Sequence, residues 1–253
     1  MRPPRDSKII TDCIVREVEE RNSKGVVVGL SGGVDSSVAV TLAVKALGPS
    51  RVLGLVLPDS KTIPHPREKK DAISLAKELK ISYRVIEIGA AKKDLMRQLP
   101  PNKLAQGNLA VRLRMGILYY YAAIRHLLVM GTSNRSELEL GYFTKYGDGA
   151  ADILPLGGLY KTDVLEIGRY MHIPHRILEK KSSPNLWKGQ TAEAEIGLSY
   201  EEIDVILRQL KTNTPQHKYP PKKFSAEKVL KVVRLVEQNR HKRSLPPICK
   251  IQT

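Results

Sequence analysis

Gly29-Leu30-Ser31-Gly32-Gly33-Val34-Asp35-Ser36-Ser37 is the segment around which this 253-residue sequence is arranged. It follows the apolar run 26–28 and precedes a mixture of apolar and small residues that ends near Leu47. This order predicts a strand, a glycine turn and a helix. Glycines let the backbone approach a ligand closely, and the first N–H groups of a helix attract an anion. The segment therefore predicts a phosphate-binding turn at the end of a buried strand.

Side chains in the turn strengthen this prediction. Ser31, Ser36 and Ser37 offer hydroxyl donors. Asp35 offers a carboxylate through which a metal ion can bridge to phosphate. The pattern is not that of Walker A, which requires Gly-x-x-x-x-Gly-Lys-Ser/Thr. Ser-Gly-Gly-Val-Asp-Ser-Ser instead resembles the PP-loop of the N-type ATP pyrophosphatases, which split ATP between its α and β phosphates.

The bulk composition is that of an ordinary globular protein with an excess of basic residues. The net charge of +16 suits polyanionic partners, but Lys and Arg recur along most expected helices, which favours a solvated surface. No apolar run reaches the length of about 20 residues that spans a membrane, and the N-terminus lacks a signal-peptide core. Cys13 and Cys249 show no metal-ligand spacing. We expect a cytoplasmic protein without structural disulfides or a zinc site.

Apolar segments that fit strands alternate with segments that fit helices in the first half of the chain. An amphipathic helix is expected over 6–22, and its inward face holds Ile9, Ile10, Cys13, Ile14 and Val18. The other expected elements are strand 26–30, helix 35–47, strand 51–57, helix 66–79, strand 81–88, helix 102–125 and strand 126–130.

Strands that are apolar on both faces and alternate with helices indicate a parallel sheet covered on both sides. The predicted fold class is therefore α/β, a doubly wound, Rossmann-like parallel sheet flanked by helices. Ligands of such sheets bind beyond the carboxyl ends of the strands. Ser31, Pro58 and Gly131 all fall at that edge, so we expect three distant segments to meet at one cleft.

The pattern changes after residue 131. Residues 141–158 are rich in Gly, Asp and Tyr and predict an ordered functional loop. Further helices are expected over 161–171, 174–180, 200–210 and 225–238. We interpret 1–253 as one domain with a C-terminal helical extension. Within it, 181–197 is expected to be a mobile active-site loop, and 214–253 to be a linker, a helix and a basic tail.

Carboxylates near the sheet edge are candidates for holding a metal ion beside phosphate. Mg²⁺ prefers oxygen ligands, usually a few carboxylates together with phosphate and water. Asp35 is one candidate, and Glu137, which follows the fourth strand, is another. Glu137 also fits the simpler role of an acid at a helix N-terminus. In the next loop Lys145, Asp148 and Asp152 fit either a grip on a polar substrate group or a solvated turn.

Six segments form a recognisable pattern, because they occur in order and at fitting distances. They are GLSGGVDSS (29–37), NLAVRLRM (108–115), GTSNRSE (131–137), GYFTKYGDGAAD (141–152), LPLGGLYK (154–161) and EIGLSYEEID (195–204). Together they resemble the NH₃-dependent NAD⁺ synthetases, in the short form without a glutaminase domain. TKYGDGAAD discriminates best, because other PP-loop enzymes share the SGGxDS loop but not this segment. The resemblance implies a fold of the adenine nucleotide alpha hydrolase type.

The resemblance implies a two-step reaction. The nicotinate carboxylate of deamido-NAD⁺ attacks the α-phosphate of ATP, which releases pyrophosphate and forms an adenylate. Ammonia then displaces AMP and leaves NAD⁺. Attack at phosphorus needs positioning and charge neutralisation more than a covalent nucleophile. A site of backbone N–H groups, Mg²⁺ and lysines suits this chemistry.

The resemblance also implies the binding residues. ATP would be held by Gly29, Leu30, Ser31, Gly32, Gly33, Val34, Asp35, Ser36, Thr132, Lys161 and Ser183. Deamido-NAD⁺ would be held by Arg112, Lys145, Asp148, Asp152, His241 and Lys242, and Mg²⁺ by Asp35 and Glu137. A homodimer through the long helix around Arg112 is implied as well, with His241 and Lys242 helping to close a substrate site, often that of the partner subunit.

The chain departs from the family pattern in the segment expected to be mobile. The family usually reads Gln-Thr-Asp-Glu where this chain has Gln190-Thr191-Ala192-Glu193. The missing acid is one we would link to ammonia or metal binding, and Glu193 or Glu195 could compensate. Lys180-Lys181-Ser182-Ser183-Pro184 also differs from the usual Lys-x-Pro-Ser-Ala, which weakens the assignment of Ser183. These departures concern the amide donor more than adenylation, and a separate glutaminase is a possible ammonia source.

Two other functions compete with this interpretation. A tRNA-modifying PP-loop enzyme would suit the basic charge, but sulfur-transferring members generally use paired site cysteines, and none of the tRNA-modifying enzymes would explain TKYGDGAAD. A nucleotide-binding regulator that has lost amidation is the other alternative, motivated by Ala192. Salt-sensitive tRNA binding would favour the first, and binding of both nucleotides without release of AMP would favour the second.

Overall fold

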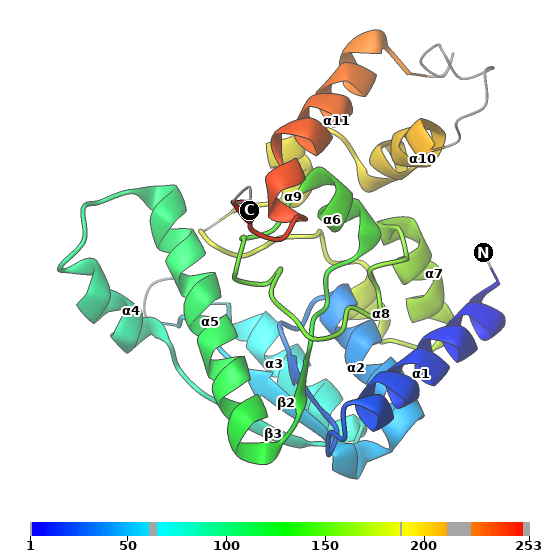
Figure 1. Cartoon of the computed structure of the whole chain (residues 1–253), viewed down its shortest axis with the longest axis vertical. Coiled ribbons are helices and arrows are strands. Elements are labelled where there is room, and N and C mark those ends of the chain that lie inside the picture. The colour runs from blue at the N-terminus through cyan, green and yellow to red at the C-terminus, as the bar shows by residue number, and fades with distance from the viewer. Residues whose placement is uncertain (1, 61–64, 188, 212–223, 250–253) are drawn as a thin grey trace, which may run out of the picture.

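The described residues form one parallel sheet of four strands, in the order β3-β2-β1-β4, which lies in the lower half of Figure 1. The strands are β1 (Val26–Gly29), β2 (Val52–Val56), β3 (Ser82–Val85) and β4 (Leu128–Met130). In the inner strand β1, Val26 lies opposite Val52 on one side and Leu128 on the other. The doubly wound parallel sheet predicted from the sequence is confirmed.

The computed structural model describes residues 2–60, 65–187, 189–211 and 224–249. Its helices are α1 (Pro3–Glu20), α2 (Val34–Leu47), α3 (Pro66–Glu78), α4 (Gly89–Met96), α5 (Lys103–Arg125), α6 (Arg135–Leu140), α7 (Lys161–Tyr170), α8 (His175–Leu178), α9 (Ala192–Ile196), α10 (Tyr200–Lys211) and α11 (Ala226–Gln238). Two 3₁₀ helices, η1 (Pro49–Arg51) and η3 (Arg240–Lys242), follow α2 and α11. None of the helices in the described ranges combines the length and the apolar character needed to cross a bilayer. The expected linker 214–223 lies outside the described residues.

Helices cover both faces of the sheet, and the alternation of side chains along β1 shows how. Val26 and Val28 belong to a core that α1, α2 and α7 complete. Val27 belongs to a second core on the opposite face, where α5 packs. A third core joins α6, α9, α10 and α11, which gather at one end of the molecule beyond the sheet (Figure 1). The helix expected over 225–238 is α11, which packs in this third core.

Three short helices escape prediction, and one helix face differs from expectation. Helices α4, α6 and α9 are 8, 6 and 5 residues long, too short to show a clear apolar period. In α1 the residues Ile10, Ile14 and Val18 are buried as predicted, but Ile9 is 55% exposed. The prediction for Ile9 was wrong because small polar residues occupy the inward positions beside the isoleucines.

Helix α1 offers a matched test of this packing. Ile14 is 1% exposed in the core between α1 and α2, so Ile14→Ala should lower the free energy of unfolding by about 2–4 kcal/mol through a cavity. Ile9→Ala on the same helix should change it by less than about 0.5 kcal/mol. Urea denaturation measures both. Equal losses for the two variants would contradict the assigned face of α1.

Candidate active site

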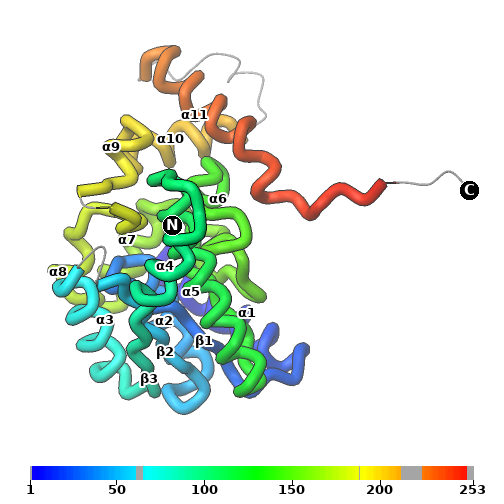
Figure 2. The backbone as a smooth tube through the Cα atoms, turned by 90° about the vertical axis from the view of Figure 1, so that its left-hand side faces the viewer, coloured from blue at the N-terminus to red at the C-terminus, as the bar shows by residue number. Residues whose placement is uncertain are grey.

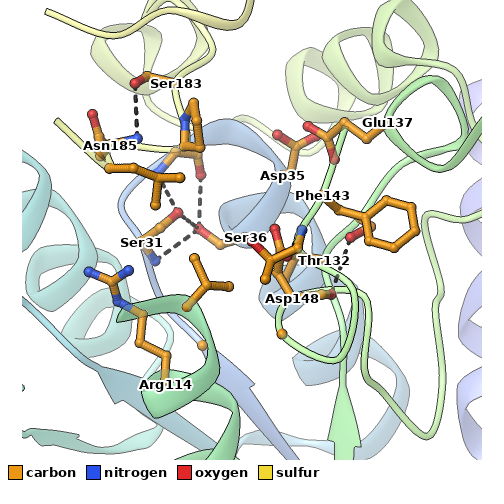
Figure 3. A pocket seen from close by; sticks show the side chains of 18 of the residues that line it. Ser31, Asp35, Ser36, Arg114, Thr132, Glu137, Phe143, Asp148, Ser183 and Asn185 are labelled. Atoms are coloured by element: carbon orange, nitrogen blue, oxygen red, sulfur yellow. Dashed lines mark hydrogen bonds between the residues drawn. The ribbon is translucent and has the colours of Figure 1, made fainter. Parts of the chain in front are cut away.

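A cavity of about 970 Å³ opens beyond the carboxyl ends of the strands (Figure 3). The glycine turn 29–36 forms its floor, and the ends of β2 and β4 continue it. Helix α5, the loop 141–150 and the segment 180–187 form its walls. The cavity lies where parallel sheets bind their ligands.

The glycine turn is held open by its own serines. Ser31 and Ser36 join through their hydroxyls at 3.0 Å, and the Ser36 hydroxyl also donates to the Gly33 carbonyl at 3.1 Å. Gly33 is the N-cap of α2 and provides no capping side chain. The first N–H groups of α2 therefore face the cavity without a side-chain cap, which makes them available to a phosphate.

Helix α3 and the segment after α8 fix the path of this turn. Gly32 has a φ of +76°, and a Cβ atom there would lie 2.2 Å from the Glu68 carbonyl oxygen, so only glycine fits. From the other side, the Lys180 ammonium donates to the Gly32 carbonyl at 3.0 Å and to the Asp71 carboxylate. Arg176 Nε donates to the second oxygen of Asp71 at 2.8 Å. The turn is thus rigid before any ligand arrives.

Asp35, Glu137 and Lys161 form a charge cluster where α2, α6 and α7 begin, and Figure 3 shows the two carboxyl groups side by side. Lys161 Nζ donates to Asp35 Oδ2, and Asn134 Nδ2 donates to Asp35 Oδ1 at 3.0 Å. The Asn134 side chain also accepts the Glu137 N–H at 3.0 Å, while Glu137 Oε2 accepts the Asn134 N–H at 3.2 Å. Glu137 therefore completes a capping box and faces the cavity at the same time.

This cluster holds two carboxylates beside one ammonium. Desolvation in the cavity and the neighbouring Asp35 carboxylate raise the pKa of Glu137 to about 8. Lys161 is 3% exposed, and burial alone would lower its pKa, but the carboxylates of Asp35 and Glu137 raise it above its ordinary value. A further cation would relieve the repulsion between the carboxylates.

Mg²⁺ fits this donor set. It commonly binds through one or two carboxylates, with phosphate oxygens and water completing its coordination. Asp35 and Glu137 supply two carboxylates beside a phosphate-binding turn. No group of three or more His, Cys, Asp or Glu side chains within the described ranges is arranged to hold a metal ion. The cluster suits a cation that arrives with a polyphosphate.

The opposite wall of the cavity joins the loop 141–152 to the C-terminal segment. Lys145 Nζ donates to the His241 carbonyl at 2.8 Å. Lys242 Nζ donates to two backbone carbonyls of that loop, at 2.6 and 3.0 Å. Arg112 from α5 donates to the Lys145 carbonyl at 3.1 Å. These cations line a wall suited to an anionic or polar substrate.

The segment that precedes α9 is ordered by side-chain hydrogen bonds. The Ser183 hydroxyl donates to the Gln190 carbonyl at 2.6 Å. Gln190 Nε2 donates to the Glu195 carboxylate at 3.0 Å, and that carboxylate also accepts the Tyr142 hydroxyl. Ser183 consequently lines the cavity, opposite the glycine turn in Figure 3.

Ala192, where the family usually has Asp, opens α9 and is 1% exposed. Glu195 lines the cavity three residues later. Glu193 instead accepts the Tyr200 N–H at 3.0 Å and is absent from the lining. Of the two acids that could compensate for Ala192, Glu195 is the one placed to do so.

The structure brings together all but one of the residues predicted to bind ATP, deamido-NAD⁺ or Mg²⁺. Their binding roles remain predictions, but each of the others lines the cavity at the sheet edge. Asp152 lies elsewhere: its Oδ2 accepts the Val129 N–H at 2.7 Å, and the residue borders a separate small hollow beside Cys13. Asp152 therefore stabilises β4 through a hydrogen bond to its backbone.

Sequence reasoning misses several residues of the cavity wall, among them Arg114, Tyr142, Gln190 and Tyr200, and it misses Asn134, which donates to Asp35. Asn134 carries a readable signal, because Asn followed three residues later by Glu marks a helix N-terminus. Nothing in the sequence marks Arg114, whose Nε donates to the Leu57 carbonyl after β2 at 2.9 Å. Such contacts depend on tertiary packing.

Comparison with known proteins identifies relatives along nearly the whole chain. The NAD synthase family matches residues 7–246. An NH₃-dependent NAD⁺ synthetase of Hyperthermus butylicus is 46% identical over 95% of this chain and 88% of its own length. The structure of an NMN synthetase from Francisella tularensis matches with a TM-score of 0.89 and 36% identity, covering 99% of this chain and 100% of that one. An NH₃-dependent NAD synthetase from Campylobacter jejuni matches with a TM-score of 0.85 and 31% identity, at the same coverage.

The contact between Asp71 and its two cations generates a prediction of pH dependence. Desolvation alone would raise the pKa of Asp71, but hydrogen bonds from Lys180 and Arg176 hold it below the usual 3.8. A lowered folded-state pKa stabilises the protein fully above the unfolded value, and the effect is lost as pH falls through the folded value. Asp71→Asn should therefore cost about 1–3 kcal/mol of unfolding free energy above about pH 5, and less below about pH 4.

Chemical denaturation at a series of pH values measures this difference. The control is Asp12→Asn, because Asp12 forms an exposed pair with Lys8 on α1 and should matter little. A cost for Asp71→Asn that stays constant down to about pH 2 would contradict the assignment.

Proposed function

The chain belongs to the NAD synthase family, and we propose how its cavity carries out the chemistry of that family. The protein is a ligase that forms a C–N bond: it amidates deamido-NAD⁺ to NAD⁺ with ATP and ammonia. The observation that supports our assignment of roles is the charge cluster of Asp35, Glu137 and Lys161 at the open N-terminus of α2.

The reaction has two steps. An oxygen of the nicotinate carboxylate attacks the α-phosphorus of ATP, the bond from that phosphorus to the α,β-bridging oxygen breaks, and pyrophosphate leaves. The substrate then carries an acyl adenylate. Ammonia attacks the acyl carbon, the C–O bond to AMP breaks, and loss of a proton leaves the carboxamide. The first step needs charge neutralisation and alignment more than a protein nucleophile.

The glycine turn and Lys161 supply that neutralisation in our proposal. The N–H groups of the turn at the start of α2 bind the phosphates, and the Lys161 ammonium lies beside them, oriented by Asp35. Thr132 and Ser183 line the same space from the end of β4 and the segment before α9. These groups are fixed before the reaction, so they need little reorganisation as charge moves to the leaving pyrophosphate.

Mg²⁺ would be held by Asp35 and Glu137 and would supply positive charge to the phosphate oxygens. The raised pKa of Glu137 means that its carboxyl group is protonated at neutral pH. Glu137 therefore has to lose this proton when it binds the cation. The two carboxylates then hold the cation, and Lys161, which Asp35 orients, neutralises charge on the phosphates.

Deamido-NAD⁺ would lie along the opposite wall. Arg112, Lys145 and Lys242 are cations around the loop 141–152, and their backbone contacts join that loop to α5 and to the C-terminal segment. Asp148 and His241 line the same part of the cavity. The contact of Asp152 with deamido-NAD⁺ remains a prediction. We assign Glu195 to the ammonia step, because it is the acid near Ala192 that lines the cavity.

The Francisella tularensis structure motivates a second candidate acceptor. That protein, an NMN synthetase, is 36% identical and matches with a TM-score of 0.89. Nicotinate mononucleotide presents the same carboxylate as deamido-NAD⁺ without the adenylate half, and it would undergo the same two steps. The tRNA-modifying and regulatory alternatives are not favoured, because the relatives match over nearly the full chain. A cytoplasmic location remains a prediction.

An incubation with ATP, Mg²⁺, ammonium and either deamido-NAD⁺ or nicotinate mononucleotide tests the proposal. We expect equal amounts of AMP and NAD⁺ with deamido-NAD⁺, resolved by chromatography. Asp35→Ala should lower the rate of AMP formation by about a hundredfold or more, since it removes the group that orients Lys161 and holds the cation. Asp12→Ala, on the exposed face of α1, serves as the control and should leave the rate unchanged.

The products separate the remaining possibilities. AMP without NAD⁺ would mean that adenylation proceeds and that ammonia transfer is lost or needs a partner protein. Faster amidation of nicotinate mononucleotide would favour the second candidate acceptor. A folded chain that releases no AMP with either acceptor would contradict the assignment as a ligase.

We propose a homodimer formed through α5. Tyr120 and Ile124 near the end of this helix are 65% and 56% exposed, which is unusual for large apolar side chains in a monomer. Figure 2 shows the described end of the chain after η3 running outward from the body, and its Leu245 and Ile248 are 89% and 88% exposed. A second copy packed along α5 would cover these surfaces.

Charged substitutions in α5 test the dimer. Tyr120→Glu and Ile124→Glu should shift the molecular mass in solution from dimer to monomer, because a charge in the centre of an apolar interface is costly. Light scattering coupled to size-exclusion chromatography measures the mass. Arg125→Gln at the end of the helix also lowers the charge by one unit, and an equal effect there would argue against a specific apolar interface.

A further inference from the structure

Helix α10 reaches the candidate active site from the C-terminal extension. Its first residue, Tyr200, and Asp204, one turn later, point to the same side, toward the start of α7. Both residues are buried, and neither was expected from the sequence to take part in the site. Their contacts lead directly to Lys161.

Asp204 ties α10 to the two helices that carry the charge cluster. Its Oδ1 accepts the Ser136 hydroxyl, and its Oδ2 accepts the Thr162 N–H at 2.8 Å. The Ser136 hydroxyl oxygen in turn accepts the Lys161 N–H at 2.9 Å. Asp204 is 1% exposed, so these contacts are shielded from water. The carboxylate thus fixes the starts of α6 and α7 relative to α10.

Tyr200 is held by this anchor beside the charge cluster. Its ring centroid lies 5.4 Å from Lys161 Nζ, and its side chain lines the cavity. The residue is only 4% exposed, yet its hydroxyl has no hydrogen-bond partner among the residues that the structure describes. Burial, together with the carboxylates of Glu137 and Asp35, raises the pKa of Tyr200, so the group is a proton donor at any physiological pH.

An unpaired buried hydroxyl is unfavourable, because it loses its hydrogen bonds to water without replacement. The side chain of Tyr200 lines the cavity in which the phosphates and the cation would lie, and its hydroxyl oxygen has almost no solvent-exposed surface. Its partner there has to be an acceptor. The acceptors that Mg·ATP brings to this position are phosphate oxygens and the water molecules bound to the metal ion.

We propose that the Tyr200 hydroxyl donates a hydrogen bond to an oxygen of the Mg²⁺-polyphosphate, and that Asp204 is the positioning residue that holds it there. This inference rests on the proposed function in one respect, the binding of Mg·ATP at the glycine turn. It adds a direct contact from a helix outside the sheet, and it gives the C-terminal extension a share in nucleotide binding.

Tyr200→Phe tests the contact by binding and melting temperature instead of turnover. Without nucleotide the variant should melt at the same temperature or higher, because it removes an unpaired buried group. Its affinity for Mg·ATP and for Mg-pyrophosphate should fall about tenfold, while its affinity for AMP should not change. The increase in melting temperature produced by Mg·ATP should shrink accordingly.

Titration with ATP in the presence of EDTA distinguishes the two acceptors. If Tyr200→Phe still binds ATP more weakly without Mg²⁺, the hydroxyl contacts a phosphate oxygen. If the difference in affinity disappears without Mg²⁺, the hydroxyl contacts metal-bound water. Both results support the proposal. The matched control is Tyr160→Phe. Tyr160 is 3% exposed, but its ring lies between the guanidinium groups of Arg135 and Arg208, outside the cavity lining. Its affinities should equal those of the unaltered chain.

The positioning role of Asp204 is tested by coupling. Asp204→Asn keeps the size of the side chain but removes a carboxylate oxygen that accepts a backbone N–H. It should weaken Mg·ATP binding, and the double variant with Tyr200→Phe should bind about as weakly as the weaker single variant, because both changes remove the same contact. Additive losses would contradict the coupling.

Other outcomes would overturn the proposal. Unchanged affinities of Tyr200→Phe for Mg·ATP and Mg-pyrophosphate would show that the hydroxyl contacts neither, and a lower melting temperature with unchanged affinities would indicate that the hydroxyl has a purely structural role. An unaltered chain that binds Mg·ATP without forming NAD⁺ would count against the proposed function, and the comparison of Tyr200→Phe would still decide this inference.

Discussion

Two carboxylates held beside one ammonium form the constraint on which the arrangement of the site depends. Lys161 and Asp35 are 126 residues apart in sequence, and Glu137 comes from a third segment. Each lies in the first turn of its helix. The positive ends of α2 and α6 favour the carboxylates. The same field disfavours Lys161 at the start of α7, so its ammonium depends on the ion pair with Asp35. The N-termini of three helices must therefore lie close together. In a parallel sheet flanked by helices, the carboxyl edge of the sheet is where helix N-termini meet.

The glycine turn is built before its ligand arrives. The backbone of α3 excludes any side chain at Gly32, and Lys180 ties the Gly32 carbonyl to Asp71. Serine hydroxyls occupy the inside of the turn. Because the turn is preformed, little of the free energy of ligand binding is lost in ordering it. The opposite wall is different, since long side chains hold it through backbone carbonyls in segments about 100 residues apart.

The sheet, its parallel sense and most helix positions could be predicted from the sequence, because buried strands and amphipathic helices leave periodic patterns. Helices α4, α6 and α9 could not, since they are shorter than the patterns that reveal a helix. The cavity floor was predictable because a contiguous motif forms it. Tyr200 and Asp204 were not, because their roles follow from how α10 packs against α7. Asp152 shows the converse: it stands in a motif of the site, but its carboxylate bonds to the backbone of β4. A residue's place in a motif therefore does not fix the direction of its side chain.

The contact of Lys145 with the His241 carbonyl has a consequence for the order in which the protein is made. The residues of the glycine turn are made early, but α3 and Lys180, which fix its path, follow later in the chain. Lys161 and Ser183, which line the same cavity, also come after the turn. The wall that contains His241 and Lys242 cannot form until those two residues have emerged. That wall is therefore the last part of the cavity to be assembled.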